Sequence, residues 1–153
     1  MGKNLSEVQW AYIAGFLDGD GAVMATIESH QEKRFGFRVR ITIKVTQYHQ
    51  KDVEWLACST GIGYIRSNKK TYEWIVRDQK AAAWLITKLR PYIRCKRRQM
   101  EIAEQIMQKP VNSKNELINI AQLADTLSSF NVRSRNRRRN FAIMIQESFS
   151  RND

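Results

Sequence analysis

The amino-acid sequence predicts an α+β domain: one four-stranded antiparallel sheet with helices on its other face, followed by a helical tail. Three observations support this class. Helical and alternating segments follow one another in the order αββαββα, short polar loops join each pair of strands, and capping residues, glycines and prolines separate the elements. The 153 residues match one domain, with a core over about residues 6–109 and tail helices over about residues 113–150.

The first helix is predicted to begin near Glu7, because Ser6 and Gln9 have the spacing of a capping box. Gly15 and Gly19 lie one turn apart on one face, where the lack of side chains lets another helix backbone come close. The helix leads into Asp-Gly-Asp-Gly at residues 18–21, and an alternating stretch begins at once. Apolar residues recur along the helix at three- and four-residue steps, at Val8, Tyr12, Ile13, Phe16 and Leu17.

Residues 34–45 give the clearest strand signal in the chain, because every odd position is apolar. The even positions are Arg34, Gly36, Arg38, Arg40, Thr42 and Lys44. One face of this strand is therefore expected to join a core, and the other is cationic. Residues 22–28 are the predicted partner strand, with residues 29–33 as the hairpin loop, and a second hairpin turns around residues 68–71.

The remaining segments are predicted to be helices. Gly61, Pro91 and Pro110 end three of them, and Ser113 with Glu116 repeats the capping-box spacing at the start of another. The helices are expected over about residues 50–60, 79–89, 96–108, 113–128 and 136–149.

The charge balance indicates a polyanionic partner. Twenty-six Lys and Arg against fifteen Asp and Glu give a net charge of +11, which favours nucleic acid, or less often an anionic membrane, over a merely soluble surface. No apolar run is long enough to span a membrane, so no membrane partner is expected. The two cysteines, Cys58 and Cys95, do not form a disulfide framework and indicate an intracellular protein.

The stretch YIAGFLDGDG, from Tyr12 to Gly21, resembles the signature of the LAGLIDADG homing endonucleases. The following αββαββα pattern extends the resemblance to about residue 108. Because a second copy of the motif is not found, the chain resembles the single-motif subgroup, whose members act as homodimers. The resemblance implies a site-specific DNA endonuclease that makes a double-strand break in a long, near-palindromic site and supports intron mobility.

The same resemblance implies the roles of individual residues. Asp20 is the metal-binding acid with the Gly19 carbonyl beside it, and the implied cofactor is Mg²⁺, with Mn²⁺ as a substitute. Asp18 is expected to face away and to serve helix-end structure; the alternative is that both aspartates only form a turn. The implied catalytic residues are Asp20, Gln47, Lys51 and Lys96, where the last three could instead be solvated surface residues, and the implied dimer interface comprises Tyr12, Gly15, Phe16 and Gly19.

The cationic sheet face is expected to contact double-stranded DNA, since a two-stranded ribbon fits the major groove. Glu28 and Glu73 have two interpretations: they accept from bases, or they pair with neighbouring Arg. The predicted contacts are Met24, Thr26, Glu28, Arg34, Arg38, Arg40, Thr42 and Lys44, then Arg66, Asn68, Lys70, Glu73, Ile75 and Arg77, with His30 at a hairpin tip and Arg138 and Arg139 on phosphates.

Two rival functions stay open on the sequence. One is an RNA maturase that binds its host intron RNA and assists splicing, and the other is a DNA-binding regulator that no longer cuts. The location is expected to be intracellular: a chloroplast or mitochondrion if the gene is organellar, otherwise the cytoplasm or nucleoid of an archaeon or bacterium.

Overall fold

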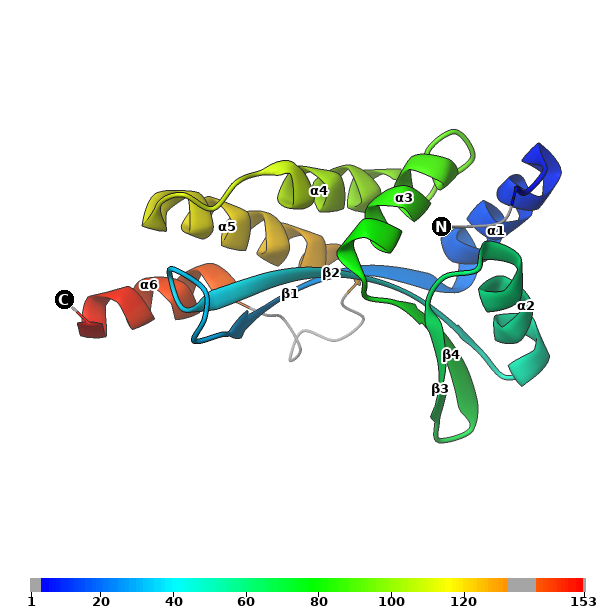
Figure 1. Cartoon of the computed structure of the whole chain (residues 1–153), viewed down its shortest axis with the longest axis horizontal. Helices are drawn as coiled ribbons and strands as arrows, with labels where there is room; N and C mark the ends of the chain where they lie inside the picture. The colour runs from blue at the N-terminus through cyan, green and yellow to red at the C-terminus, as the bar shows by residue number, and fades with distance from the viewer. Residues whose placement is uncertain (1–3, 132–139, 153) are drawn as a thin grey trace.

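The predicted α+β fold is confirmed in a computed structural model, which describes residues 4–131 and 140–152. The elements follow the expected order, with two further helices after α4 (Figure 1). They are α1 (Glu7–Asp20), β1 (Gly21–Ser29), β2 (Phe37–Gln47), α2 (Gln50–Thr60), β3 (Tyr64–Asn68), β4 (Thr71–Val76), α3 (Gln79–Leu89), α4 (Arg97–Gln108), α5 (Lys114–Asn131) and α6 (Phe141–Asn152).

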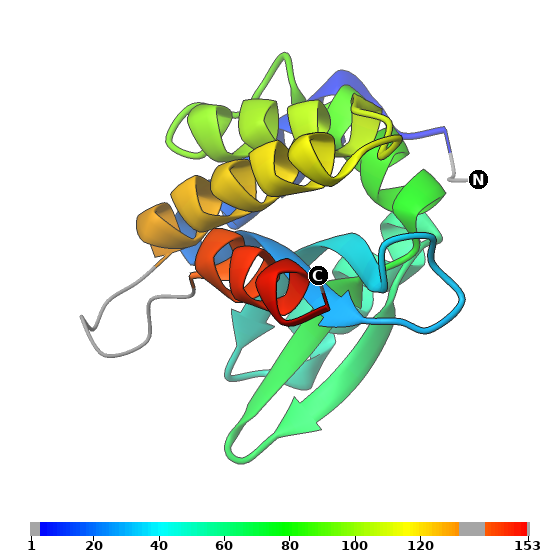
Figure 2. The ribbon, with the colours of Figure 1, turned by 90° about the vertical axis from the view of Figure 1, so that its left-hand side faces the viewer.

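The four strands form one antiparallel sheet in the order β1-β2-β4-β3. Helices α3, α4 and α5 lie over one face of this sheet, and the opposite face is concave because the β3–β4 hairpin bends away from the helices (Figures 1 and 2). Among the described residues, no helix combines the length and the apolar character that a membrane crossing requires. The fold therefore presents one helix-covered face and one open face of the same sheet.

Burial follows the alternation in the sequence. Ile41, Ile43 and Val45 have at most 1% of their surface exposed, and they face the helices together with apolar side chains of β1 and β4. Trp74 is fully buried and donates its indole N–H to the Ile62 carbonyl at 2.9 Å, so the largest core side chain leaves no unpaired donor.

The junction between α1 and β1 has no loop. The capping box of Ser6 and Gln9 starts the helix as predicted, and Asp20 ends it one residue before the strand begins. Gly21 is required here by close packing, since a Cβ at this position would lie 2.6 Å from the Leu17 carbonyl oxygen. The side chain of Asp20 is thereby fixed at the point where helix and sheet meet.

The first hairpin differs from the sequence-based expectation. The loop comprises residues 30–36 rather than 29–33, so Arg34 is a loop residue and not part of β2. Gly36 has a φ of +77°, and its carbonyl accepts from the His30 N–H at 2.8 Å, which closes the loop before strand pairing begins. His30 therefore lies at the base of the hairpin and not at its tip.

Two helix ends also differ from the expectation. Helix α5 continues to Asn131, three residues beyond the predicted end, and α6 ends at Asn152 instead of residue 149. Helix α6 is described from Phe141 onward, where the Asp125 carboxylate accepts from the N–H groups of Phe141 and Ala142. The predicted start at residue 136 lies outside the described residues, as do Arg138 and Arg139.

Candidate active site

A cavity of about 480 Å³ opens where the end of α1 meets the sheet. Several elements that are distant in the sequence contribute to it, because β1 and β2 pair beside α1 while α4 and α5 pass above. Its lining residues are Asp20, Gly21, Ala22, Lys44, Thr46, Lys96, Gln99, Phe130 and Asn131. The cavity thus combines one carboxylate with two lysines and several neutral polar groups.

Asp20 is exposed at the end of α1, and its Oδ2 accepts a hydrogen bond from Gln47 Nε2 at 2.7 Å. The two residues meet because Gly21 pairs with Val45, which brings the end of β2 beside the end of the helix. The structure therefore brings together two of the predicted catalytic residues. The bond orients the carboxylate, and the exposure of Asp20 leaves it accessible to a ligand.

Lys96 is held in place by Asp18. The Asp18 carboxylate accepts from the N–H groups of Arg94 and Lys96 at 2.8 and 2.9 Å, and Lys96 Nζ donates to the Asp18 carbonyl at 2.7 Å. Three bonds thus attach the segment before α4 to the end of α1. Asp18 has the helix-end structural role that was expected, but it binds a distant segment and does not cap its own helix.

The other predicted catalytic positions are less tightly connected. Lys51 is exposed in the first turn of α2 and does not line the cavity that holds Asp20 and Lys96. Gly19 is exposed in the last turn of α1. Among residues 4–131 and 140–152, no three His, Cys, Asp or Glu side chains are grouped closely enough to hold a metal ion by themselves.

The donor set nevertheless fits Mg²⁺. This ion is usually bound through one or two carboxylates together with waters and substrate phosphates, and it does not require a closed cage of protein ligands. Asp20 supplies one accessible hard oxygen donor, whereas the neighbouring Asp18 is occupied by two backbone N–H groups. A single chain therefore offers one acid to such an ion.

On the open face of the sheet, acidic and basic side chains from neighbouring strands pair. Glu28 on β1 lies opposite Arg38 on β2 and accepts from it at 2.8 Å. The hydrogen bond from Arg38 lowers the pKa of the Glu28 carboxyl, with further lowering by the charges of Arg38, Arg40 and Arg77. These cationic residues therefore share one part of the open face, as the alternation predicted.

Glu73 lies at the centre of a second charged cluster and is only 1% exposed. Its carboxylate accepts from Lys44 Nζ at 2.7 Å, Arg66 Nε at 2.9 Å and Asn68 Nδ2 at 3.3 Å. Burial alone would raise the pKa of Glu73, but the hydrogen bonds from Lys44, Arg66 and Asn68 hold it below the usual value. The same contact with Glu73 raises the pKa of Arg66.

Some predicted DNA contacts are corrected by this geometry. Glu73, Ile75 and Thr42 are 1%, 3% and 8% exposed, so their side chains are not free to contact DNA. Pairing with basic neighbours accounts for Glu73. Arg34 also departs from the expectation, because it lines a cavity between the loop and the helices instead of the open face.

The remaining predicted contacts divide by exposure. Asn68 and Lys70 are exposed at the turn of the second hairpin, and Arg66 is exposed on β3. The others are half-buried: Met24, Thr26, Glu28, His30, Arg38, Arg40, Lys44 and Arg77.

Several cavity residues had not been predicted from the sequence. Gln99 comes from α4 and is 8% exposed, whereas Phe130 at the end of α5 is 48% exposed. Asn131 donates to the Val23 carbonyl and so attaches the end of α5 to the strand that follows Asp20. The alternation alone could have identified Thr46, because it continues the even face of β2 beyond Lys44.

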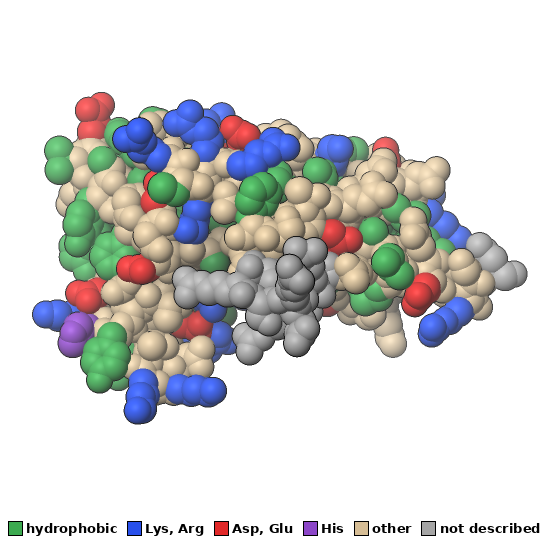
Figure 3. Space-filling model, turned by 180° about the vertical axis from the view of Figure 1, so that it is seen from behind, with side chains coloured by type: hydrophobic (Ala, Val, Ile, Leu, Met, Phe, Trp, Pro, Cys, Tyr) green, Lys and Arg blue, Asp and Glu red, His purple; other side chains and the backbone are tan. Residues whose placement is uncertain are grey.

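The outer side of α1 is open and partly apolar. Val8 and Tyr12 are 78% and 58% exposed, and a Cβ added to Gly15 or Gly19 would meet nothing within 4 Å. The Tyr12 ring packs edge-on against Trp55 of α2 with 5.2 Å between centroids, and it contacts the half-buried ring of Phe16. Figure 3 shows apolar side chains gathered at the end of the molecule where α1 and α2 lie.

Comparison with protein families relates this geometry to known proteins. The LAGLIDADG endonuclease family matches residues 13–107. The DNA endonuclease I-CvuI of Chlorella vulgaris is 31% identical over 124 residues, which cover 78% of this chain and 77% of the relative. The DNA endonuclease I-CreI of Chlamydomonas reinhardtii is 26% identical over 125 residues, with the same coverage of both chains.

Solved structures agree with this match over nearly the whole chain. The homing endonuclease I-CvuI in complex with the I-CreI target and 2 mM Mg has a TM-score of 0.84 at 25% identity, covering 95% of this chain and 94% of that chain. The complex of I-CvuI with its own target in 2 mM Ca gives a TM-score of 0.82 at 26% identity, with 94% of each chain covered. The likeness therefore includes the helices after α4.

Proposed function

The chain belongs to the LAGLIDADG endonuclease family, and from that premise we propose that it is a site-specific homing endonuclease that cuts double-stranded DNA by Mg²⁺-dependent phosphodiester hydrolysis. Its relatives are DNA endonucleases, and the similar solved structures are complexes with DNA targets in the presence of Mg or Ca. The proposed working form is a homodimer acting on a long, near-palindromic site, with Mn²⁺ able to replace Mg²⁺.

The observation that carries the proposal is the exposed carboxylate of Asp20, hydrogen-bonded to Gln47 and in one cavity with Lys96. When bound, Mg²⁺ would supply activation of a water and stabilisation of the leaving oxygen at the scissile phosphate. Asp20 and the Gly19 carbonyl are the groups of this chain that would hold the ion. Gln47 orients Asp20, and the Lys96 ammonium provides positive charge where a phosphate would lie.

Two copies of the chain are needed because a double-strand break requires two hydrolyses and each chain offers one such acid. The open side of α1 supports this assembly, since Gly15 and Gly19 carry no side chain that would separate two helices. The exposed Tyr12 and Val8 beside them form the kind of apolar patch that marks an interface. Packing two α1 helices together would bring both Asp20 residues toward the two-fold axis.

The concave face of the sheet supports DNA binding beneath this centre. Arg38, Arg40, Lys44, Arg66 and Arg77 lie on strands or strand ends of the open face. With a net charge of +22 for two chains, twice the +11 of one, binding is expected to weaken steeply as the salt concentration rises.

The direct test is cleavage of a randomised library of duplex sites by the purified protein. With Mg²⁺ we expect double-strand breaks that enrich a near-palindromic sequence, and with EDTA none. Ca²⁺, another hard cation that takes oxygen ligands, is expected to support binding with little cutting. Sequence-specific binding in Mg²⁺ without any cutting would instead favour a DNA-binding regulator. Cutting that persists in EDTA would show that the cleavage reaction does not require a divalent metal ion.

The dimer is tested by Gly15→Arg, because a Cβ at this position meets nothing within 4 Å in the single chain, whereas an Arg side chain would separate two packed helices. Analytical ultracentrifugation is expected to show a dimer for the wild-type protein and a monomer for the variant, with unchanged circular dichroism. Gln105→Arg, at an exposed position of α4, serves as the control for added charge. A dimer that tolerates Gly15→Arg would place the interface elsewhere.

A further inference from the structure

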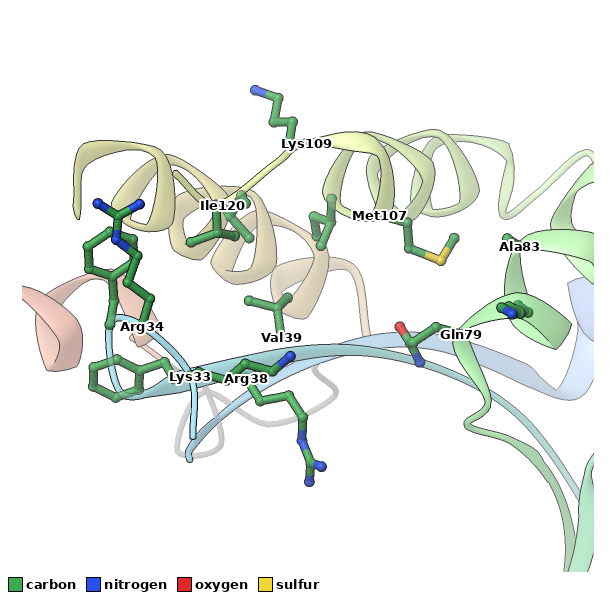
Figure 4. A pocket seen from close by; sticks show the side chains of 14 residues that line it. Lys33, Arg34, Arg38, Val39, Gln79, Ala83, Met107, Lys109 and Ile120 are labelled. Atoms are coloured by element: carbon green, nitrogen blue, oxygen red, sulfur yellow. The ribbon is translucent and has the colours of Figure 1, made fainter. Parts of the chain in front are cut away.

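A second cavity, of about 560 Å³, lies on the side of the sheet opposite the proposed DNA-binding face (Figure 4). It exists because the apolar face of β2 extends further than the helices cover it. Ile41 and Ile43 are fully buried, whereas Phe37 and Val39, near the start of the same strand, are only half-buried. The volume is in the range of pockets that take small molecules.

The inner wall of this cavity is apolar. Val39 from the sheet faces Met107 and Ile120 from the helices (Figure 4), and Phe37 and Ile106 complete the wall. Such a surface favours the apolar part of a ligand, since burying a polar group there without a partner costs free energy.

The one amide on the wall has its hydrogen bonds with the protein backbone. Gln79 Oε1 accepts from the Ile41 N–H at 2.8 Å, and its Nε2 donates to the carbonyls of Ile41 and Arg77 at 2.9 and 2.7 Å. Both N–H groups of the amide are therefore used. The wall offers little to a hydrogen-bonding ligand such as a nucleobase.

The opening of the cavity is lined by basic side chains. Lys33, Arg34, Lys80 and Lys109 line the cavity, and no Asp or Glu does so among the described residues. Arg38 also contributes to the lining, but its guanidinium points to the other side of the sheet and bonds Glu28 (Figure 4). Lys109 extends outward in Figure 4, and the Arg34 guanidinium lies over the Phe35 ring, 5.2 Å from its centroid. Lys33 and Lys80 are therefore the candidates for an anionic group.

We propose that this cavity binds a small amphiphilic anion, with an apolar body against Val39, Met107 and Ile120 and an anionic head attracted by the two lysines of the opening, Lys33 and Lys80. A DNA phosphate would use the cations and leave the apolar wall empty, and a neutral apolar molecule would leave the cations unpartnered. The inference is independent of the proposed cleavage activity, because neither the lining nor the test involves Asp20.

The probe is decanoate, and its binding to the full-length protein is measured by methyl NMR. Decanol and inorganic phosphate are the comparison ligands. We expect decanoate to shift the methyl signals of Val39, Met107 and Ile120, decanol to bind several-fold more weakly, and phosphate to leave these signals unchanged. Signals that move instead at Val8 would assign the binding to the α1 surface and overturn the proposal. A short DNA duplex that shifts the cavity signals and excludes decanoate would also overturn it.

Two variants test the contributions of the apolar wall and of the basic opening separately. Ala83→Phe adds a ring at a half-buried position of the lining and is expected to weaken decanoate binding at least about tenfold. Lys33→Gln with Lys80→Gln is expected to weaken decanoate about threefold to tenfold and decanol not at all. Lys88→Gln, an exposed α3 residue outside the lining, is the matched control.

Thermal melting of each variant shows that it folds. Because the two lysines are exposed, the charge variants keep the proposal testable even if Ala83→Phe does not fold. Equal affinity of decanoate for the wild-type protein and the double lysine variant would refute the assigned role of the cations.

Discussion

Asp20 and Glu73 are two carboxylates near the open side of one sheet, and their surroundings are opposite. Glu73 is 1% exposed and accepts from Lys44, Arg66 and Asn68. Asp20 is exposed and accepts from Gln47 alone among the hydrogen bonds of the described residues. One carboxylate has its acceptor sites filled by the protein, and the other keeps acceptor capacity for a ligand.

This difference separates a structural carboxylate from a candidate catalytic one. Glu73 neutralises cations of the same face and fixes their positions, at the cost of leaving fewer free charges for DNA. Asp20 is oriented by one neutral donor, and within residues 4–131 and 140–152 no cation forms an ion pair with its carboxylate. Four predictions test this contrast, from the largest expected effect to the smallest.

Asp20→Asn is expected to lower the cleavage rate at least about 100-fold, or about 2.7 kcal/mol, because it removes the anionic oxygen while preserving size. DNA affinity should stay close to that of the wild-type protein. Single-turnover cleavage and a binding assay in Ca²⁺ measure the two quantities separately. Retained strand scission would remove Asp20 from the mechanism.

Glu73→Gln is expected to lower the free energy of unfolding by about 1–3 kcal/mol. The new amide NH₂ group would face the donors of Lys44, Arg66 and Asn68. Donors that face one another without an acceptor are destabilising at a buried site. Urea unfolding measures the change. Glu28→Gln is the matched control, since the Glu28 side chain is 41% exposed and its solvent-screened pair with Arg38 should contribute less to stability than the buried cluster. Equal losses at both positions would contradict the contrast.

Asp18→Asn is expected to slow cleavage about tenfold, which corresponds to about 1.4 kcal/mol. An amide accepts hydrogen bonds only through its oxygen, so one of the N–H groups of Arg94 and Lys96 loses its partner. The Lys96 side chain is then less well positioned. Asp52→Asn, a charge loss in α2 away from these bonds, is the control. If Asp18→Asn matched Asp20→Asn in its effect, Asp18 would have a direct catalytic role.

Acid is expected to weaken the Glu73 cluster specifically. Because the pKa of Glu73 is lowered in the folded chain from its usual value near 4.5, its ionised form adds stability above that value, and this stability is lost as the pH falls through the lowered pKa. The stability difference between wild type and Glu73→Gln should therefore shrink between about pH 5 and the acid range. A stability difference that stays constant with pH would show that ionisation of Glu73 does not contribute to the stability of the folded chain.

Much of the fold could be predicted because the local signals agree with one another. The capping boxes at Ser6 and Ser113 start α1 and α5 where expected, and Gly61 ends α2 in the left-handed conformation. The error at the first hairpin arose because Phe35 keeps the alternation going into the loop. Only the backbone turn at Gly36 ends it.

The candidate site was less predictable because its parts come from distant segments. The spacing of the motif indicated Asp20, but the positions of Gln99 and Asn131 depend on how α4 and α5 pass over the sheet. Likewise, the choice between base contact and ion pairing for Glu73 depends on cross-strand neighbours. Alternation predicts on which face of a strand a side chain lies. It does not predict which side chains on that face form hydrogen bonds with one another.

The three bonds of Asp18 have a mechanical consequence. They join the last turn of α1 to the segment that carries Lys96, so a shift of the helix end would be passed to the lysine. A tilt of α1 would displace the ammonium group in step with the helix. A partner that packs against the outer side of α1 would therefore change the position of the Lys96 ammonium group in the cavity, without a rearrangement of any loop.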